Sequence, residues 1–354
     1  MNARERCSGR PGISRDPVAT CRLRAAEGDG ILNFKKKIWS ALTCQRFRTR
    51  RRVAALQILA LALVSTFFFS CSRPQPNSST TAVTHEVTDE AGRHVTLPIK
   101  IDRIVSLAPN LTEIVYAVGA GDRLVGDTSY CDYPPEAKNL TKVGDTLHPS
   151  IERIIALKPQ IVLVSTASQL ENFTRQLDEQ KIAVYVTNPQ TVVQVFDAIE
   201  KLGQLFGTGD VTSRLLSDLR RRALAVETVS APLMPVRVFY QVSDQPLYTI
   251  GRDAYLTDLI KRAGGVSVTA DVPTAFPRFS DEAALASKPD AIILPTGGSM
   301  GNANSNVAAA LKNSPAVRDN RVYKINDDLL SRPGPRLVDG LEQLARSLHP
   351  EAFK

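Results

Sequence analysis

Two stretches of this 354-residue chain follow one pattern. Residues 150–166 and 280–296 each begin with Ser and carry Glu two positions later, then continue through Ala and a Lys-Pro pair to an apolar run that ends in Thr. Ser favours the position before the first turn of a helix, Pro ends a helix, and a short apolar run indicates a buried strand. The repeat therefore predicts two lobes of similar design, each with a helix that leads into a buried strand.

A helical segment separates the two copies of this pattern. Strands alternate with helices on both sides of it, which is typical of parallel α/β sheets. Between the copies, Thr191–Phe206 and Asp210–Val229 are predicted as consecutive helices, and a helix of about 20 residues spans about 30 Å. The apolar stripe expected on the second helix consists of Val211, Leu215, Leu219, Ala223 and Val226. We predict an α/β fold of two small lobes with central, mostly parallel sheets, joined by one long bridging helix, with a ligand cleft between them.

The predicted boundaries divide the chain into six parts. They are a leader at 1–45, a signal sequence at 46–71, a tether at 72–84, an N-terminal lobe at 85–190, a helical linker at 191–231 and a C-terminal lobe at 232–354. The leader is rich in Arg and has no periodicity, which indicates a disordered tail or an over-extended gene start. The tether is rich in Ser, Thr, Pro and Asn, a composition typical of a flexible linker.

The charge is divided unevenly along the chain. The formal net charge is +8, but residues 1–71 hold 14 Lys and Arg against 4 Asp and Glu, a net charge of +10. The other 30 basic and 32 acidic residues give the body a net charge of −2. Because nucleic-acid binding needs Lys and Arg clustered on the folded part, we predict no nucleic-acid partner.

Residues 46–71 have the three parts of a secretory signal. A basic run at Arg46–Arg52 precedes the apolar run Val53–Phe69, and the small residue Ser70 stands before Cys71. This junction resembles the lipobox of bacterial lipoproteins, which implies that Cys71 is acylated and tethers the protein to a membrane. An uncleaved membrane anchor is the alternative. Both place the body on the periplasmic or cell-surface side.

The body contains one cysteine. Of the five in the chain, Cys7, Cys21, Cys44 and Cys71 precede the body, and only Cys131 lies within it. A disulfide within the body is therefore impossible, and we expect Cys131 to be a small buried packing residue.

Five segments of the body resemble the ABC-importer substrate-binding lipoproteins of the helical-backbone class, which capture vitamin B12, ferric siderophores or haem. They are Arg103–Glu113, Gly119–Gly126, Tyr130–Pro135, Ile151–Pro159 and Arg332–Asp339. The sequence Tyr-Cys-Asp-Tyr-Pro-Pro at 130–135 favours the vitamin B12-binding branch. The resemblance implies a monomeric, non-enzymatic receptor with a metal chelate in the cleft, no covalent cofactor, and an ABC permease as partner.

The candidate ligand-binding residues are mainly tyrosines. B12-binding relatives stack tryptophans on the corrin, whereas the only Trp here is Trp39 in the leader. Tyr offers both an apolar face and a hydrogen-bonding tip, which suits a large flat ligand. The predicted contacts are Tyr130, Tyr133, His148, Ser165, Tyr185, Tyr240, Tyr248 and Arg336. They favour cobalamin or another corrinoid, with a siderophore or Tyr-ligated haem as the alternatives.

The family also implies docking to the permease through one acidic residue on each lobe. Glu171 matches the position in the first lobe. The second-lobe position is Ser331 here, so Glu282 is the expected substitute, with Asp328 as a further possibility.

A short Gly-rich motif raises a competing function. Gly297–Gly301 matches Gly-x-Ser-x-Gly, the nucleophile elbow of serine hydrolases, with Ser299 as nucleophile and Asp327 and His349 as partners. The Asn-rich stretch that follows is typical of a loop rather than of the helix that an elbow requires. The chain's histidines, His85, His94, His148 and His349, show no zinc-ligand spacing. We therefore predict neither an enzyme nor a metal-ion site.

The helix after Pro109 carries a predicted cap. Asn110 is expected to cap its first turn, with Glu113 at the capping-box position three residues on. The same helix end could offer hydrogen-bond donors to a polar ligand.

Overall fold

The computed structural model describes residues 83–165, 170–298 and 306–354, without the side chains of residues 170–172. All of them belong to one compact unit, Thr80–Lys354. The predicted signal, Cys71 and Ser299 lie outside this part of the chain. Within it, no helix is both long and apolar enough to cross a membrane.

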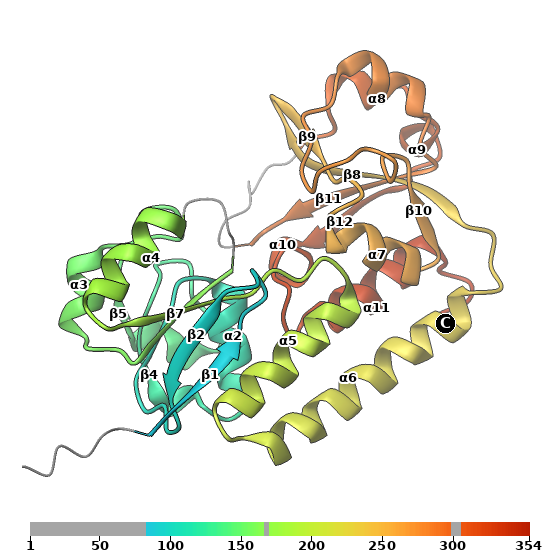
Figure 1. Cartoon of the computed structure of the whole chain (residues 1–354). Coiled ribbons are helices and arrows are strands. Elements are labelled where there is room, and N and C mark those ends of the chain that lie inside the picture. Colours follow the sequence, from blue (N-terminus) through green and yellow to red (C-terminus); the bar gives the residue numbers. More distant parts are fainter. Residues whose placement is uncertain (1–82, 166–169, 299–305) are drawn as a thin grey trace, which may run out of the picture. The chain divides into compact units, whose positions relative to one another are not determined.

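The N-terminal lobe is built on a five-stranded parallel sheet with the strand order β5-β4-β3-β6-β7 (Figure 1). A hairpin of β1 (Thr84–Thr88) and β2 (His94–Pro98) precedes it. The sheet strands are β3 (Ile104–Ser106), β4 (Leu124–Asp127), β5 (Thr141–Lys142), β6 (Ile161–Val164) and β7 (Ala183–Val186). The helices are α2 (Pro109–Ala117), α3 (Ile151–Ala156) and α4 (Leu170–Glu179), with 3-10 turns at Gly121–Arg123 and Pro135–Asn139.

The C-terminal lobe has a second parallel sheet with the order β10-β8-β11-β12, and one antiparallel strand, β9, pairs with β8. The strands are β8 (Val236–Asp244), β9 (Leu247–Thr249), β10 (Gly265–Ser267), β11 (Ala291–Thr296) and β12 (Val322–Asn326). The helices are α7 (Tyr255–Arg262), α8 (Asp281–Ser287), α9 (Pro315–Arg318), α10 (Asp327–Leu330) and α11 (Leu337–Leu348), with a 3-10 turn at Ala309–Leu311. The sequence pattern missed β9, β10, α9 and α10, because elements of three or four residues are too short to show a period.

The sequence repeat corresponds to equivalent parts of the two lobes. Ser150 and Ser280 both cap their helices, accepting hydrogen bonds from backbone amides three residues on at 3.3 and 3.1 Å. Lys158 and Lys288 both adopt left-handed backbone conformations, with φ of 48° and 42°, where the helix ends. The strands that follow, β6 and β11, hold the same place in the orders β4-β3-β6-β7 and β10-β8-β11-β12. The expectation of two lobes of similar design is confirmed.

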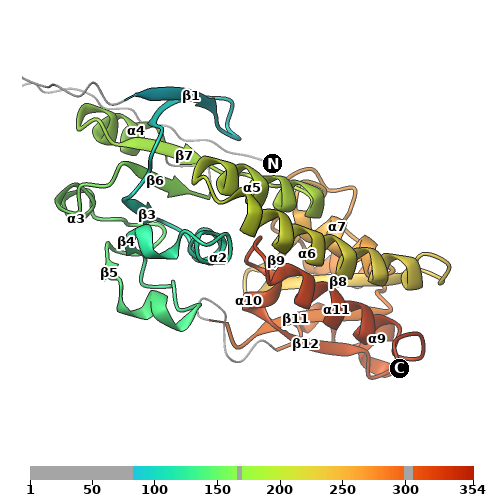
Figure 2. The ribbon, with the colours of Figure 1, turned by 90° about the horizontal axis from the view of Figure 1, so that it is seen from below.

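Two antiparallel helices connect the lobes, α5 (Val192–Leu205) and α6 (Gly209–Ser230), and the views in Figures 1 and 2 show them side by side. α6 begins beside the N-terminal lobe, where Val211 contacts Gly119, and ends beside Gly264 of the C-terminal lobe. The residues that α6 buries are Thr212, Leu216, Leu219, Ala223, Val226 and Ser230. Of the predicted stripe, Leu219, Ala223 and Val226 are buried and Leu215 packs, partly buried, against the core. The prediction is wrong at Val211, which is 38 % exposed, whereas Thr212 packs closely against Gly203 of α5.

The hydrophobic core continues from one lobe into the other. Its largest cluster contains buried residues of β3, α2, α5, α6, β8, α7 and α11. Two smaller clusters lie on the outer faces of the sheets, one with Ile154 and Leu177 under α3 and α4, the other with Ala284 and Leu311 beneath α8. Because closely packed cores resist deformation, a shared core limits the motion of one lobe relative to the other.

Candidate functional site

A cavity of about 400 Å³ lies between the lobes, at the carboxyl ends of both sheets. Such strand ends are where α/β folds bind ligands, and the volume falls within the range of small-molecule sites. The N-terminal lobe contributes Ser165, which follows β6, and Asn188–Gln190, which follow β7. The described lining residues of the C-terminal lobe are Tyr240, Val242, Asp253, Ala254, Tyr255, Leu256, Ala275, Phe276, Pro295, Asp327, Ser331 and Pro333.

Two buried tyrosines line the cavity on the C-terminal side. The Tyr255 hydroxyl donates a hydrogen bond to the backbone oxygen of Leu330 at 2.7 Å, and burial raises its pKa well above the ordinary value. Tyr240 is 2 % exposed, and burial together with the nearby charge of Asp327 raises its pKa. Both phenols therefore keep their protons at neutral pH.

The charged groups of the lining are acidic. They are Asp253, which is exposed, and Asp327, which is 8 % exposed. Burial raises the pKa of Asp327, while a hydrogen bond from the Ser331 hydroxyl acts in the opposite direction. None of the described lining residues is Lys, Arg or His. The cavity therefore suits a ligand surface that is neutral or that donates hydrogen bonds.

Of the predicted ligand residues, Ser165 and Tyr240 lie at the cavity. Tyr185 is 3 % exposed within the shared core, and burial, with smaller contributions from Glu90 and Asp89, raises its pKa to about 12. Tyr248 is half-buried on β9 and does not line the cavity. His148 is exposed, and its ring lies 3.3 Å from Asp145.

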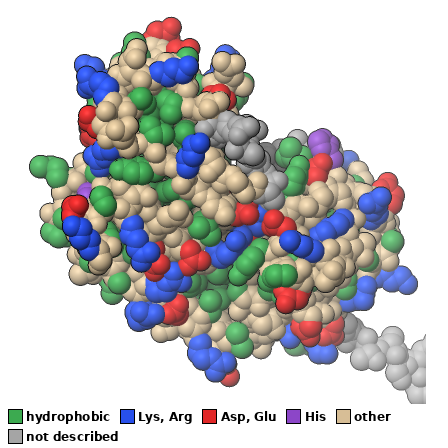
Figure 3. Space-filling model, turned by 180° about the vertical axis from the view of Figure 1, so that it is seen from behind, with side chains coloured by type: hydrophobic (Ala, Val, Ile, Leu, Met, Phe, Trp, Pro, Cys, Tyr) green, Lys and Arg blue, Asp and Glu red, His purple; other side chains and the backbone are tan. Residues whose placement is uncertain are grey.

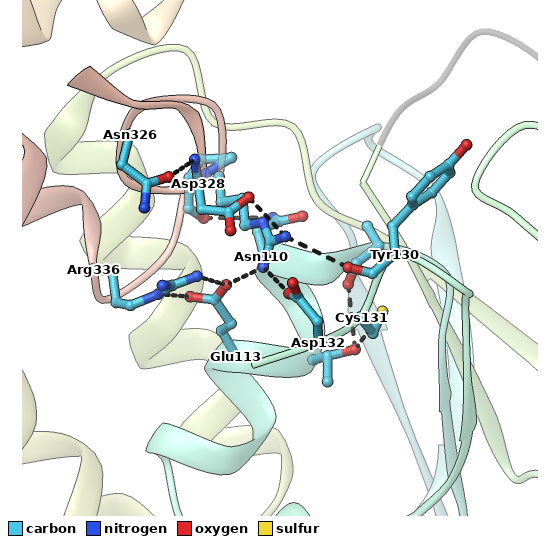
Figure 4. Close-up of polar contacts among 12 residues, drawn as sticks. Asn110, Glu113, Tyr130, Cys131, Asp132, Asn326, Asp328 and Arg336 are labelled. Carbon is cyan, nitrogen blue, oxygen red and sulfur yellow. Dashed lines mark hydrogen bonds and ion pairs between the residues drawn. The ribbon is translucent and has the colours of Figure 1, made fainter. Parts of the chain in front are cut away.

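Of the remaining predicted residues, Arg336 belongs to an ion-pair cluster that joins the lobes (Figure 4). Glu113 of α2 accepts hydrogen bonds from Arg332 at 2.9 Å and from the Nε and Nη2 atoms of Arg336 at 2.8 and 2.6 Å. Arg332 also binds Asp132 at 2.9 Å and Asp328 at 2.8 Å. We call these five residues the interlobe cluster. The side chains of Glu113 and Arg332 are each 2 % exposed, so the cluster is desolvated at its centre.

Tyr133 and Tyr130 flank this cluster. The guanidinium of Arg336 stacks on the Tyr133 ring, 4.0 Å from its centroid, a favourable cation–π arrangement. The Tyr130 backbone oxygen accepts a hydrogen bond from Arg332 at 3.5 Å. Arg336 thus pairs with an acidic group of the protein itself, Glu113 of the other lobe.

The predicted cap of α2 is wrong. Ala108 occupies the cap position, and no side chain accepts a hydrogen bond from the first turn. Pro109 occupies the first helical position. A backbone amide there would have no partner within the helix, so the amide hydrogen that Pro lacks costs nothing. Asn110 instead donates to the Pro333 backbone oxygen at 3.4 Å, and Glu113 binds the two arginines of the other lobe.

The partners proposed for Ser299 do not form a catalytic pair. Asp327 follows β12, at the carboxyl edge of its sheet, whereas His349 contacts the Gly264 backbone oxygen at 2.9 Å, beside the amino end of β10. In a parallel sheet these are opposite edges. The part of the chain that the structure covers also contains no group of three His, Cys, Asp or Glu side chains that could hold a metal ion.

Cys131 is buried and makes no disulfide, as expected. Its sulfur lies 3.2 Å from the hydroxyls of Thr112 and Thr128, and burial raises the pKa of the thiol. The thiol is therefore unreactive at neutral pH.

Several cavity residues escaped the sequence reasoning. Tyr255 opens α7, Phe276 lies in a loop with 52 % exposure, and Asp327 was considered only as a hydrolase residue. Asp327 directly follows β12, where ligand contacts concentrate, whereas Tyr255 and Phe276 lie further along the segments that follow β9 and β10.

On the face shown in Figure 3, basic and acidic side chains are interspersed. A clustered basic footprint, which nucleic-acid binding needs, is not evident on this face. The absence of a nucleic-acid partner stays a prediction.

Comparison with known proteins supports the family interpretation. The model of the periplasmic binding protein family matches residues 104–329, more than half of the chain. An uncharacterized ABC transporter substrate-binding lipoprotein, YvrC of Bacillus subtilis, is 33 % identical over 309 residues, covering 83 % of this chain and 97 % of its own. The vitamin B12-binding protein of Vibrio cholerae is 32 % identical over 251 residues, covering 71 % and 90 %.

Solved structures agree with this result. The periplasmic vitamin B12 binding protein BtuF of Vibrio cholerae superposes with a TM-score of 0.61 at 31 % identity, over 72 % of this chain and 98 % of its own. The apo form of the periplasmic haem-binding protein RhuT from Roseiflexus sp. RS-1 superposes with a TM-score of 0.62 at 25 % identity, over 71 % and 99 %. The predicted two-lobe α/β fold is confirmed, and members of this family carry substrates rather than convert them. The chain belongs to the periplasmic binding protein family, and its relatives include an ABC transporter substrate-binding lipoprotein and proteins that bind vitamin B12 or haem.

Proposed function

We propose that the protein is an extracytoplasmic receptor that captures a corrinoid, of the cobalamin type, in the interlobe cavity and delivers it to an ABC permease. The observation that carries this proposal is the charge of the cavity: its described lining holds two carboxylates and no cationic side chain. Relatives named as vitamin B12-binding proteins, at about one third identity, support the same ligand class.

The acidic lining distinguishes the candidate ligands. The periphery of a corrin carries neutral carboxamides, whereas haem carries two propionates and many ferric siderophores are anionic. An anionic ligand would bring like charges near Asp327 in a partly desolvated site, where electrostatic repulsion is strong.

Membrane tethering and docking complete the proposal. Acylation of Cys71 would hold the receptor at the membrane surface as a monomer. Glu171 of α4 and Glu282 of α8 remain our proposed docking acids. Glu282 is exposed in the first turn of α8, and hydrogen bonds from its own backbone amide and from Ser280 lower its pKa. The repeat gives it an equivalent in the other lobe, Glu152 of α3, which is exposed and hydrogen-bonded in the same way.

A titration of the purified protein with cyanocobalamin tests the ligand. We expect saturable binding, with haem and ferric siderophores binding more weakly. Phe276→Ala, which removes an exposed ring from the cavity wall, is expected to weaken binding about tenfold, the order of effect for a buried aromatic contact. Leu285→Ala is the matched control, because Leu285 is 58 % exposed on α8 and lies outside the cavity. Absence of binding at tens of micromolar would contradict the corrinoid proposal.

An uptake assay tests the docking proposal separately. Charge reversal by Glu282→Lys is expected to lower uptake while the affinity for cyanocobalamin is preserved. Asp319→Lys, at an exposed residue elsewhere on the same lobe, is the control. Equal uptake by the two variants would exclude Glu282 as a docking residue.

A further inference from the structure

One hydroxyl in the cavity has no hydrogen-bond partner within the described part of the chain. The Tyr240 side chain is 98 % buried, lines the cavity, and its hydroxyl makes no hydrogen bond of good geometry to any residue that the structure describes. The Ser331 hydroxyl lies close to it, but donates its hydrogen bond to Asp327 Oδ1. A buried polar group without a partner is unfavourable, so this hydroxyl indicates a place where a ligand atom forms the missing hydrogen bond.

Asp327 supplies the complementary group beside it. Its charge lies close enough to Tyr240 to raise the pKa of the phenol. Ser331 occupies Oδ1 of the carboxyl, and the side chains within the described ranges offer no hydrogen bond to Oδ2. The wall of the cavity therefore presents a hydroxyl donor and a carboxylate acceptor next to each other.

A primary carboxamide matches this pair. Its carbonyl oxygen can accept a hydrogen bond from Tyr240, and its NH2 group can donate one to Asp327. A carboxylate in the same place would bring a second negative charge against Asp327, and it has no proton to donate. The two groups thus distinguish an amide from the corresponding acid.

We propose that Tyr240 and Asp327 form a carboxamide-selective subsite that determines which ligands the cavity accepts. The inference rests on the proposed function, because carboxamides are the peripheral groups of the corrinoids proposed to bind there. It assigns the selectivity to two named residues, with Ser331 positioning the Asp327 carboxyl.

The first experiment compares cyanocobalamin with the monocarboxylic acids produced by mild hydrolysis of single propionamides, using calorimetric titration of the purified full chain. We expect at least one acid to bind about tenfold more weakly than cyanocobalamin. Tyr240→Phe is expected to weaken cyanocobalamin binding by about fivefold, the effect of one neutral hydrogen bond. Asp327→Asn is expected to reduce the discrimination between amide and acid, because the new amide group can donate to a carboxylate.

The matched control is Tyr185→Phe, which removes the hydroxyl of an equally buried tyrosine in the other lobe. It is expected to keep the amide-to-acid ratio of the unsubstituted protein. Equal affinity for cyanocobalamin and every acid would overturn the proposal, as would an unchanged ratio in Asp327→Asn.

A second experiment is independent of corrinoid binding. Propionamide and propionate are added at millimolar concentration to protein labelled with ¹³C at the tyrosine rings, and the Tyr240 signal is assigned with Tyr240→Phe. We expect propionamide, but not propionate, to shift this signal. If cyanocobalamin fails to bind while propionamide remains selective, the subsite is supported and the corrinoid function is not. If propionate shifts the signal equally, the subsite is overturned.

Discussion

Replacing Glu113 with Ala removes the carboxylate on which the interlobe cluster converges. Glu113 is 3 % exposed and accepts three hydrogen bonds from Arg332 and Arg336. Arg332 keeps Asp132 and Asp328 as partners in the variant. Arg336, whose side chain is 18 % exposed, loses its only ion-pair partner among the described residues. The cost therefore comes mainly from a half-desolvated arginine left without a carboxylate.

Loss of one partner of a buried ion pair costs about 3–5 kcal/mol. The lower end applies here, about 3 kcal/mol, because Arg336 can regain some water and keeps its stacking on Tyr133. In a domain of this size each kcal/mol lowers Tm by about 2–4 °C, so we expect a decrease of about 6–12 °C. Urea unfolding followed by circular dichroism gives the free energy, and calorimetry gives the Tm and the number of transitions.

The matched control is Arg222→Gln. Arg222 of α6 also binds two carboxylates, those of Asp339 and Glu342, but its side chain and both partners are more exposed. Exposed pairs contribute about 1 kcal/mol or less, so this variant is expected to lose much less stability. If Glu113→Ala and Arg222→Gln lose the same free energy of unfolding, burial of the interlobe cluster does not have the effect argued above.

Three further predictions concern the body. Burial raises the pKa of Asp127 to about 6 despite its 2.7 Å ion pair with Lys142. Between pH 4 and 6 the folded state therefore binds more protons than the unfolded state, and the free energy of unfolding falls by roughly 3 kcal/mol as pH rises through this window. Asp127→Asn is expected to remove that slope from urea unfolding measured at several pH values, and an unchanged slope would contradict the assignment. Gly203→Ala is expected to lower the free energy of unfolding by about 1–3 kcal/mol, because the added Cβ would overlap a threonine of α6. The control is Gly209→Ala, whose Cβ enters open space and is expected to be neutral or stabilising. Equal free energies of unfolding in the two variants would refute the close packing of α5 and α6. Lys288→Gly is expected to raise the free energy of unfolding by up to about 1 kcal/mol, and with it the Tm, because Gly adopts the left-handed conformation without strain. A lower Tm would show that this conformation carries no cost.

The fold could be predicted from the sequence because its signals are local. Ser150 and Ser280 cap their helices through hydrogen bonds to amides three residues on, and each helix ends just before its Lys-Pro pair. The orientation of α6 was less accessible, because it depends on how closely α5 approaches at Gly203. Which face of a helix is buried depends partly on the neighbouring helix, so the periodicity of its own sequence does not determine that face alone.

The site was predicted less completely for the same physical reason. Glu113 three residues after Asn110 fits a capping box, yet its partners Arg332 and Arg336 lie more than 200 residues away. Local pattern cannot distinguish these two uses of one carboxylate. Tyr240 and Tyr185 both lie on buried strands, and only the lobe arrangement places one at the cavity and the other in the shared core.

The segment from Asp327 to Arg336 serves the cavity and the lobe interface at once. Asp327 and Ser331 face the cavity, while Arg332 and Arg336 hold Glu113 of the other lobe. Asp327 begins α10, and Arg336 stands at the start of α11, so one short segment carries both sets of residues. We therefore expect a change in one set to affect the other.

This arrangement predicts an asymmetry between the two sites. Glu113→Ala loosens the support of Asp327 and Ser331, so we expect it to weaken ligand binding as well as folding. Tyr240→Phe removes only a hydroxyl that has no hydrogen-bond partner among the residues the structure describes, so it is expected to change affinity while the unfolding transition keeps its Tm. With the core continuous between the lobes, selection among ligands then depends on the chemistry of the cavity wall rather than on a large closure of the lobes.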